Sequence, residues 1–401
     1  MTSPASRQLP LAGLKVLELG QLIAGPFATK MLGEFGADVI KVEPPGTGDP
    51  LRKWRIIEDG TSLWWHVQSR TKRSMTLDLR SEEGQAMVRR LAAEADVLVE
   101  NFRPGTLEGW GLGYEALAEH NPGLIMVRVS GFGQTGPYRD KPGFGVIGEA
   151  MGGLRYLTGQ PGEPSVRVGV SIGDSLSALY AVIGTLLALQ ERSRSGLGQQ
   201  IDVALYESVF AMMESLLPEY DAAGQVREPS GSALPGITPS NAYRTRSGDY
   251  VLIAGNGDSI FKRLMGVIGR ADLAEDPDLA HNDGRSRQAE RIDAAIEAWT
   301  LERDRDAILA ALDDARVPAG YPYTAADIAN DPHYLAREMI QTITRPDGKP
   351  LRVPGVLPRL SATPGRLGEG GPALGQHTDE VLDELGIDPE TRAKLRDAGI
   401  I

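Results

Sequence analysis

The stretch Gly169-Val-Ser-Ile-Gly-Asp-Ser-Leu-Ser-Ala-Leu179 joins a short run of β-prone residues to the most apolar helical pattern in the chain. The run, Val166 to Val170, predicts a strand. After it, apolar residues recur at the i, i+3, i+4 and i+7 spacing of a buried helix face, to about Ser193. Asp174 lies where the predicted strand ends and the helix begins. Its carboxylate can therefore meet unpaired backbone N–H groups and the positive end of the helix dipole.

Two interpretations of Asp174 follow from this position. The first is an N-cap, because Asp is a favoured capping residue and a cap needs no chemistry. The second is a carboxylate nucleophile with small neighbours, Gly173, Ser175 and Ser177, which allow a bulky substrate to come close. A carboxylate can attack an acyl centre and hold a covalent intermediate, which divides one difficult step into two.

The same stretch contains a G-x-S-x-G pattern, Gly169 to Gly173, which is typical of the nucleophile elbow of α/β-hydrolases. That fold needs an acid and a histidine after the serine. The sequence does not assign His281, His333 or His377 to such a triad. The helical pattern also begins after Ser171 rather than at it, so the hydrolase interpretation is the weaker one.

Composition limits the classes of function. A chain of 401 residues is long enough for two domains, and its net charge of −12 disfavours non-specific binding to nucleic acid or anionic membranes. The absence of cysteine excludes disulfides and thiolate catalysis. The N-terminus has no apolar signal-peptide core, and the longest apolar stretch is shorter than the roughly 20 residues of a membrane span. We expect a soluble cytoplasmic protein without a membrane partner.

The first 220 residues alternate between strand and helix patterns, which predicts parallel strands with right-handed crossovers. The predicted strands are Leu14–Leu19, Asp38–Glu43, Met75–Leu79, Asp96–Asn101 and Leu124–Ser130. Because ligands collect at the carboxyl ends of such strands, Gly20, Glu43 and Asn101 should face one crevice. Glu43 has no G-x-G-x-x-G before it, and Pro26-Phe27 replaces the Lys-Ser/Thr of a P-loop, so we expect neither NAD nor a P-loop nucleotide site.

Two further segments carry candidate binding residues. Arg70, Lys72 and Arg73 form a basic cluster before the predicted strand at Met75, interpreted either as a solvated loop end or as a phosphate site. Gly255-Asn-Gly-Asp258 lies between a predicted hairpin and a helix, and is interpreted either as a turn with an N-cap or as a mobile glycine loop over a site.

Several short segments, in this order along the chain, resemble those of the family III CoA-transferases, the group with formyl-CoA transferases, carnitine-CoA enzymes and α-methylacyl-CoA racemases. The matching segments are Pro10–Leu19, Ala24–Ala28, Gly36–Glu43, Lys72–Ser74, Val99–Phe102, Gly131–Pro137, Gly173–Ser175 and Gly375–Thr378. Each segment is weak evidence alone, but the ordered set spans nearly the whole chain.

The resemblance implies a Rossmann-like, doubly wound parallel sheet built by both chain ends, an inserted smaller α+β domain, and a homodimer of interlocked chains. With the composition breaks, it predicts a large CoA-binding domain over 1–220, a linker over 221–240, a small domain over 241–330, and a linker returning to the large domain over 331–401. It also implies site residues: catalytic Asp174, CoA contacts at Ala24, Arg70, Lys72, Arg73, Asn101 and Phe102, and a substrate loop at Gly255, Asn256, Gly257 and Asp258.

The function implied is transfer of CoA from an acyl-CoA, such as succinyl-CoA, to a small dicarboxylate through an aspartyl anhydride and an aspartyl-CoA thioester. CoA is then a bound substrate, and no metal or redox cofactor is expected. The alternatives are an α-methylacyl-CoA racemase and a CoA-binding protein without turnover. A racemase needs a base such as His, and none lies between His120 and His281. Ile23 and Phe144 replace polar residues of some family members, so those substrate contacts are not expected here.

Overall fold

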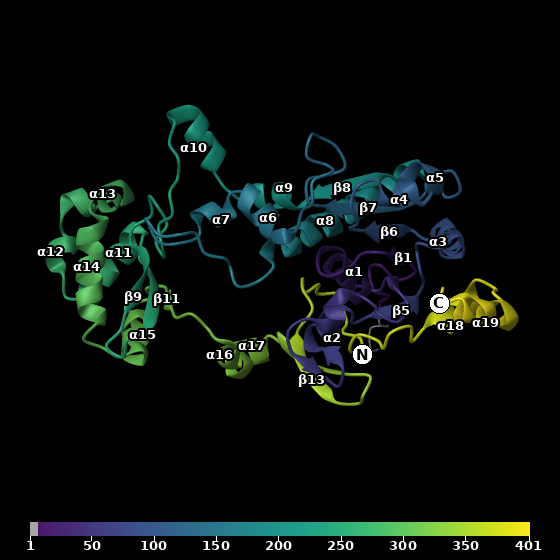
Figure 1. Cartoon of the computed structure of the whole chain (residues 1–401). Coiled ribbons are helices and arrows are strands. Elements are labelled where there is room, and N and C mark those ends of the chain that lie inside the picture. Colours follow the sequence, from purple (N-terminus) through teal and green to yellow (C-terminus); the bar gives the residue numbers. More distant parts are fainter. Residues whose placement is uncertain (1–6) are drawn as a thin grey trace. The chain divides into compact units, whose positions relative to one another are not determined.

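The computed structural model of the chain describes residues 7–401 (Figure 1). It divides into two compact units. Among the described residues, the first comprises 7–155, 168–218 and 333–401, and the second comprises 156–167 and 219–332.

A six-stranded sheet forms the centre of the first unit. The strands are β1 (Lys15–Glu18), β2 (Asp38–Glu43), β5 (Lys72–Thr76), β6 (Val97–Glu100), β7 (Ile125–Ser130) and β8 (Gln200–Ala204). Their order is β5-β2-β1-β6-β7-β8, and every neighbouring pair is parallel. This is the 3-2-1-4-5-6 order of dinucleotide-binding folds, in which the chain reverses its direction of winding between β1 and β6.

Successive side chains along each strand point to opposite faces of the sheet, so they pack in two apolar layers. Val16 and Val97 pack in one layer with α1 (Ala24–Glu34) and α8 (Ile172–Ser195), whereas Leu17 and Leu98 pack in the other with α3 (Glu82–Glu94), α18 (Thr378–Glu384) and α19 (Pro389–Asp397). All four side chains are at most 2% exposed. Burial on both faces explains the short apolar runs 97–99 and 125–127, whereas the charged Lys41 and Arg128 lie in buried ion pairs.

The helices of this unit cover both faces of the sheet (Figure 1). They are α1 (Ala24–Glu34), α2 (Leu63–Gln68), α3 (Glu82–Glu94), α4 (Thr106–Gly109), α5 (Tyr114–Ala118), α6 (Gly145–Met151), α8 (Ile172–Ser195), α9 (Leu205–Phe210), α18 (Thr378–Glu384) and α19 (Pro389–Asp397). Two small hairpins, β3 (Ile57–Glu58) with β4 (Thr61–Ser62) and β12 (Ile340–Thr344) with β13 (Pro350–Pro354), complete it.

The C-terminal segment seals the edge of the sheet at β5. Ser74 N–H donates to His377 Nδ1 at 3.1 Å, and His377 N–H donates to the Ser74 carbonyl at 2.9 Å. Thr76 N–H donates to Thr378 Oγ1 at 3.0 Å. The edge strand therefore has its outward backbone groups satisfied by residues about 300 positions later in the chain.

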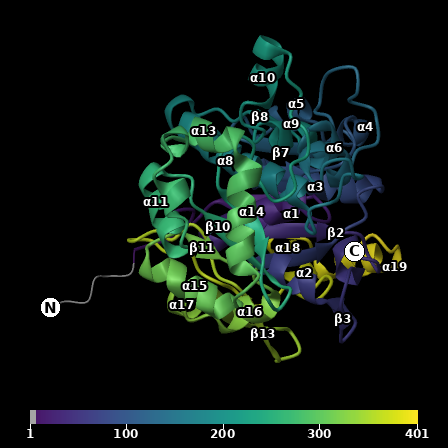
Figure 2. The same cartoon turned by 90° about the vertical axis from the view of Figure 1, so that its left-hand side faces the viewer.

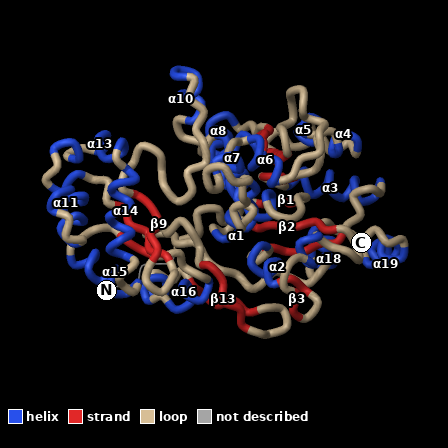
Figure 3. The backbone as a smooth tube through the Cα atoms, turned by 60° about the vertical axis from the view of Figure 1, so that its left-hand side comes forward, coloured by secondary structure: helices blue, strands red, loops and turns tan. Residues whose placement is uncertain are grey.

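The second unit is a small α+β unit. Its antiparallel sheet has the order β11 (Ala319–Gly320), β10 (Tyr250–Ala254), β9 (Ser240–Arg244). Its helices are α11 (Asp258–Val267), α12 (Ala271–Ala274), α13 (Asn282–Arg287), α14 (Ala289–Thr300), α15 (Arg305–Asp314) and α16 (Ala325–Asn330). Helix α14 lies beside β9 (Figure 3), and Figure 2 shows α11, α13 and α14 of this unit from another side. The short helices α7 (Leu154–Leu157), α10 (Leu216–Ala223) and α17 (Pro332–Ala336) cross the unit boundaries.

Several expectations about the local structure were wrong. Val166 to Val170 form no strand, and α8 begins at Ile172, so Asp174 lies inside the helix. β5 begins at Lys72 rather than Met75, because Lys72 and Arg73 have ion-pair partners that let cationic side chains lie in a sheet.

Helix α8 is also longer and more apolar than expected. Its 24 residues suffice, by length and composition, to cross a membrane, with a mean hydropathy of 1.6 over its most apolar window. The core helix of a soluble protein passes the same test. Ala178, Ala181 and Ala188 pack in the apolar layer against the sheet, but only 33% of that most apolar window is buried.

Candidate active site

A cavity of about 250 Å³ opens at the carboxyl end of the sheet, next to the reversal point between β1 and β6. We call it the Asp174 cavity. It is lined by Gln21, Leu22, Ile23, Ala24, Asn101, Phe102, Val129, Ser130, Gly131, Gly143, Phe144, Asp174 and Leu205. The structure thus brings together residues after β1, after β6 and after β7 with the start of α8. Predicted site residues Ala24, Asn101, Phe102 and Asp174 all lie here.

Asp174 is the third residue of α8 and lies in its first turn. The N-cap position is Ser171, so the capping interpretation of Asp174 does not hold. The Ser175 hydroxyl donates to the Ser171 carbonyl at 3.0 Å, and the Ser177 hydroxyl donates to the Gly173 carbonyl at 2.9 Å. The first helical turn keeps the carboxylate near the positive end of the dipole without making it a cap.

Glycine provides the space around the carboxylate. A Cβ atom at Gly145 would lie 2.1 Å from Asp174 Oδ2, closer than any such contact allows. A Cβ atom at Gly173 would lie 3.2 Å from the Gly145 carbonyl oxygen. Helices α6 and α8 therefore meet through these two glycines, and the Asp174 side chain fills the place that a side chain at residue 145 would take.

The turn between β1 and α1 forms one wall of the cavity, and buried side chains hold its backbone. Gln21 N–H donates to Asn101 Oδ1, and Asn101 Nδ2 donates to the Gln21 carbonyl, both at 2.8 Å. Leu22 has a left-handed φ of 65°, which costs a non-glycine residue about 1–3 kcal/mol. Its N–H donates to both oxygens of Asp49, each at 3.1 Å. Asn101 thus contacts the cavity while its amide positions the turn.

The basic cluster does not form a single site. Arg70 is buried and pairs with Glu34 at 2.5 Å, and its Nη1 donates to the Pro354 carbonyl at 2.8 Å. Lys72 is buried and pairs with Glu18 at 2.8 Å. Burial lowers the pKa of Lys72 to about 8, so the ammonium is still mostly charged at pH 7. Both cations are already engaged in buried ion pairs.

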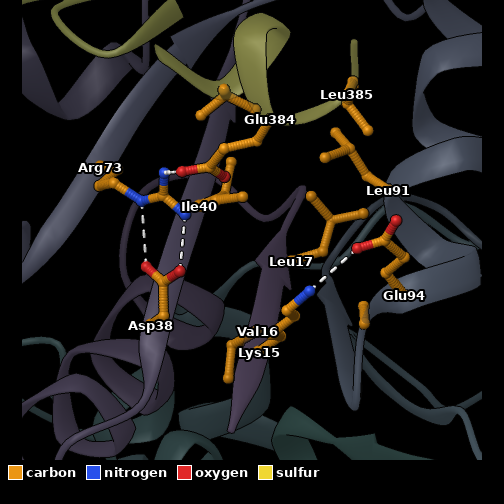
Figure 4. Close-up of a pocket in the computed structure, with 12 residues that line it drawn as sticks. Lys15, Val16, Leu17, Asp38, Ile40, Arg73, Leu91, Glu94, Glu384 and Leu385 are labelled. Carbon is orange, nitrogen blue, oxygen red and sulfur yellow. Dashed lines mark hydrogen bonds and ion pairs between the residues drawn. The ribbon is translucent and has the colours of Figure 1, made fainter. Parts of the chain in front are cut away.

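Arg73 lies at the opposite, amino end of the sheet (Figure 4). Its guanidinium donates to both oxygens of Asp38, at 3.0 and 2.6 Å, and to Glu384 at 2.6 Å. In doubly wound folds ligands bind at the carboxyl ends of the strands. That Arg70, Lys72 and Arg73 contact CoA stays a prediction, and each of them has a structural ion pair.

A second cavity of about 440 Å³ adjoins the first, and the two share Gln21 and Phe102 as lining residues. We call it the adjoining cavity. Its walls include Leu19, Val42, Leu77, Leu79, Trp110, Glu43, Asp78 and Arg80. Phe102 and Trp110 meet edge to face, with ring centroids 5.5 Å apart. The exposed Arg103 follows Phe102 directly.

The predicted substrate loop, Gly255 to Asp258, belongs to the second unit. Buried Arg285 holds it: Nη2 donates to the Asn256 carbonyl at 2.6 Å and to Asp258 Oδ1 at 2.7 Å. Gly257 is the N-cap residue of α11, as the turn interpretation expected. Whether the loop contacts substrate stays a prediction.

Comparison with known proteins identifies the family. The sequence profile of CoA-transferase family III matches residues 11–378. The chain belongs to CoA-transferase family III. Its large unit, with an aspartate at the carboxyl edge of a doubly wound sheet, is therefore that of a CoA-transferase.

Several relatives of this CoA-transferase are named for dicarboxylate substrates. It is 51% identical over 394 residues to the succinyl-CoA–D-citramalate CoA-transferase of Chloroflexus aurantiacus, covering 98% of each chain. It is 37% identical to the succinate–glutarate CoA-transferase of Agrobacterium fabrum, covering 96% of this chain and 98% of the relative. A solved CAIB/BAIF family protein from Brucella suis, 38% identical, superposes with a TM-score of 0.83 over 94% of this chain and 100% of its own.

Sequence reasoning missed several residues that shape this CoA-transferase site. Gly145 and Asp174 lie close together on two different helices, and neither segment has a sequence pattern that predicts this approach. Leu22 is not a residue type that predicts a left-handed turn. Asp49, in contrast, precedes Pro50, and Asp before Pro is typical of a helix start. None of the histidines among residues 7–401 lines either cavity.

Proposed function

We propose that this chain transfers CoA from succinyl-CoA to a small dicarboxylate, with Asp174 as the nucleophile. One observation carries the proposal. Among the residues that line the Asp174 cavity, in the described part of the chain, Asp174 is the one ionisable side chain. A carboxylate in a cavity whose other lining residues are uncharged can act as a covalent nucleophile toward an acyl group.

The reaction balances without water or a net proton. An Asp174 oxygen attacks the thioester carbonyl of succinyl-CoA, and the CoA thiolate leaves, which gives a mixed anhydride. The thiolate attacks the aspartyl carbonyl, and succinate leaves, which gives an aspartyl-CoA thioester. The acceptor carboxylate then attacks the aspartyl carbonyl and releases the thiolate. Attack of that thiolate on the acceptor acyl group forms the new thioester and restores Asp174.

Each tetrahedral step needs hydrogen-bond donors for the oxyanion. The backbone N–H group of Gly173 is the candidate within the first unit. Gly173 supports this role because it lies in the first turn of α8, where backbone N–H groups have no partner within the helix.

The shared walls of the two cavities support one path for acyl-CoA. The thioester would lie by Asp174, the pantetheine arm would pass Gln21 and Phe102, and the nucleotide would occupy the adjoining cavity. Arg80 lines that cavity and Arg103 is exposed beside Phe102, so both are placed to meet phosphate oxygens.

The names of the relatives support the substrate class. Four of the relatives are named for succinyl-CoA or succinate together with citramalate, malate, glutarate or mesaconate. Each named acceptor carries a second carboxylate. Assays with D-citramalate, L-malate, glutarate and mesaconate as acceptors would order them by kcat/KM.

The outer face of α8 supports assembly into a homodimer. Leu179, Ile183, Leu186 and Leu187 are between 40% and 66% exposed in the single chain. Beside them a cavity of about 350 Å³ is lined by Tyr180, Gly184, Ile201 and neighbouring residues. An apolar face of this kind on a central helix marks an interaction surface, and a second copy of the chain is the partner we propose.

Trapping with hydroxylamine tests the function. The protein is incubated with succinyl-CoA and quenched with hydroxylamine, and the peptide with residue 174 is examined by mass spectrometry. A hydroxamate at Asp174, absent from Asp174→Asn, is the expected result. An unmodified peptide with every acyl-CoA tested would overturn the proposal. Exchange of deuterium at the substrate α-carbon would then indicate the racemase.

A further inference from the structure

The turn from Gly20 to Ile23 is held almost entirely by side chains from elsewhere in the first unit. Besides the bonds from Asn101, the Gly20 carbonyl accepts from Lys41 Nζ at 2.8 Å, and the Ile23 carbonyl accepts from Gln68 Nε2 at 2.9 Å. The Leu22 N–H is held by Asp49 alone. Side chains outside this turn therefore fix the position of the peptide groups that form a wall of the Asp174 cavity.

Asp49 is the centre of this support and is 1% exposed. Its carboxylate accepts hydrogen bonds from the Leu22 N–H at 3.1 Å, from the Leu51 N–H at 2.9 Å and from Lys41 Nζ at 2.8 Å. Leu22 is the residue that needs support, since its left-handed φ of 65° is unfavourable for a side chain with a Cβ atom. A charged acceptor on its N–H opposes relaxation of the turn.

A neutral set of buried charges holds Asp49 in turn. Lys41 pairs with both Asp49 and Glu18, at 2.8 and 2.7 Å, and Glu18 pairs with Lys72. Burial disfavours the charge on Glu18, but Lys41 and Lys72 outweigh it and lower its pKa to about 2. The two acids and two lysines thus form a buried chain of ion pairs, and none of them is among the residues that line the Asp174 cavity.

We propose that Asp49 is a positioning residue of the acyl-CoA site, which keeps Leu22 left-handed and so fixes the wall formed by Gln21 to Ala24. The proposal rests on the proposed function. It predicts that loss of the Asp49 charge weakens binding of CoA, because the wall relaxes, while the chemistry at Asp174 is preserved at saturating substrate.

The test uses Asp49→Asn in the full-length protein, with CoA binding measured by titration calorimetry and transfer measured from succinyl-CoA. We expect the Kd for CoA and the KM for succinyl-CoA to rise at least tenfold, with kcat within threefold. Glu34→Gln is the matched control. It removes a buried, paired carboxylate at the other end of α1, about 15 Å from Ala24 by helix rise, and should leave Kd and KM within twofold.

Leu22→Gly supplies the second variant, because glycine adopts a left-handed φ without support. In that background, Asp49→Asn should raise the Kd less than threefold. An equal rise in both backgrounds, or a Kd unchanged by Asp49→Asn alone, would overturn the proposal. If Asp49→Asn does not fold, recovery of the fold in the double variant supports the coupling and failure to recover contradicts it.

Different results would contradict the proposed function and the positioning role of Asp49. Absence of CoA transfer by the unaltered protein would contradict the function. Normal transfer with no selective effect of Asp49→Asn would contradict only the positioning role.

Discussion

Gly145 lies so close to Asp174 that a single methyl group at residue 145 would overlap the carboxylate, 2.1 Å from Oδ2 and 2.9 Å from Cγ. Both groups are on helices, so neither backbone can move away cheaply. The carboxylate itself would have to turn. We expect Gly145→Ala to lower kcat at least tenfold, because Asp174 leaves its position for attack, while the protein stays folded.

Steady-state kinetics and circular dichroism would check this variant. Gly266→Ala is its control, since residue 266 lies within α11 and has no atom within 4 Å of an added Cβ. The control should keep full activity and gain slightly in stability from the better helix propensity of Ala. Unchanged kcat in Gly145→Ala would show that the reactive rotamer does not need this space.

A substitution of Arg73 would show whether this member of the basic cluster has a structural role or binds CoA. Its guanidinium bonds Asp38, Glu380 and Glu384, which are all about half exposed. Because these pairs are partly solvated, we expect Arg73→Gln to reduce the free energy of unfolding by only about 1 kcal/mol. The Kd for CoA should not change. Urea denaturation would measure the free energy of unfolding, and calorimetry would measure the Kd for CoA. A tenfold weaker affinity for CoA would show that Arg73 belongs to the binding site.

The seal on β5 should depend on pH through His377. Its Nδ1 accepts a hydrogen bond from the Ser74 N–H, so this nitrogen must be unprotonated. Burial lowers the pKa of His377 below its ordinary 6.5, with Arg73 adding to the effect. The native state thus binds fewer protons than the unfolded one. The stabilisation is complete above pH 6.5 and is lost as the pH falls through the lowered pKa.

His377→Asn is the variant to compare, since Asn Oδ1 can accept the same bond and does not titrate. Unfolding free energies between pH 7.5 and 5 should fall less steeply for the variant. A residual slope is expected, because burial also lowers the pKa of His66. Identical slopes in the two proteins would exclude His377 as the titrating group.

The apolar face of α8 should control assembly. Ile183 and Leu187 are 50% and 66% exposed, and charges there would be buried in an interface at high cost. We expect the pair Ile183→Glu and Leu187→Glu to reduce the mass by light scattering from two chains to one. Leu357→Glu, at a residue 52% exposed away from α8, should leave it unchanged. An unaltered mass for the double variant would exclude this face.

Much of the sheet could be predicted because its strands are buried on both faces. Val97–Glu100 and Ile125–Ser130 consist mostly of β-branched and other apolar residues, which leave little alternative to a parallel core strand. β5 was placed three residues late for the opposite reason. Lys72 and Arg73 look like loop residues until the carboxylates of Glu18 and Asp38, distant in sequence, neutralise them.

The place of Asp174 near a helix start could be predicted because it depends on a local pattern, although the helix begins two residues before it. Its catalytic role stays a prediction. The hydrogen bonds of Asn101 and Asp49 to the turn before α1 depend on tertiary pairing across 80 and 27 residues. No local pattern encodes such a pairing, so sequence reasoning named Asn101 as a CoA contact without its second role.

The tail that covers β5 has a consequence for synthesis of the chain. Ser74 and His377 are 303 residues apart. At a translation rate of about 5–20 residues per second, the ribosome needs roughly 15–60 s to make the partner that closes this edge. During that time the nascent sheet carries an open strand able to pair with neighbouring chains, which makes the interval before release the period of greatest risk of aggregation.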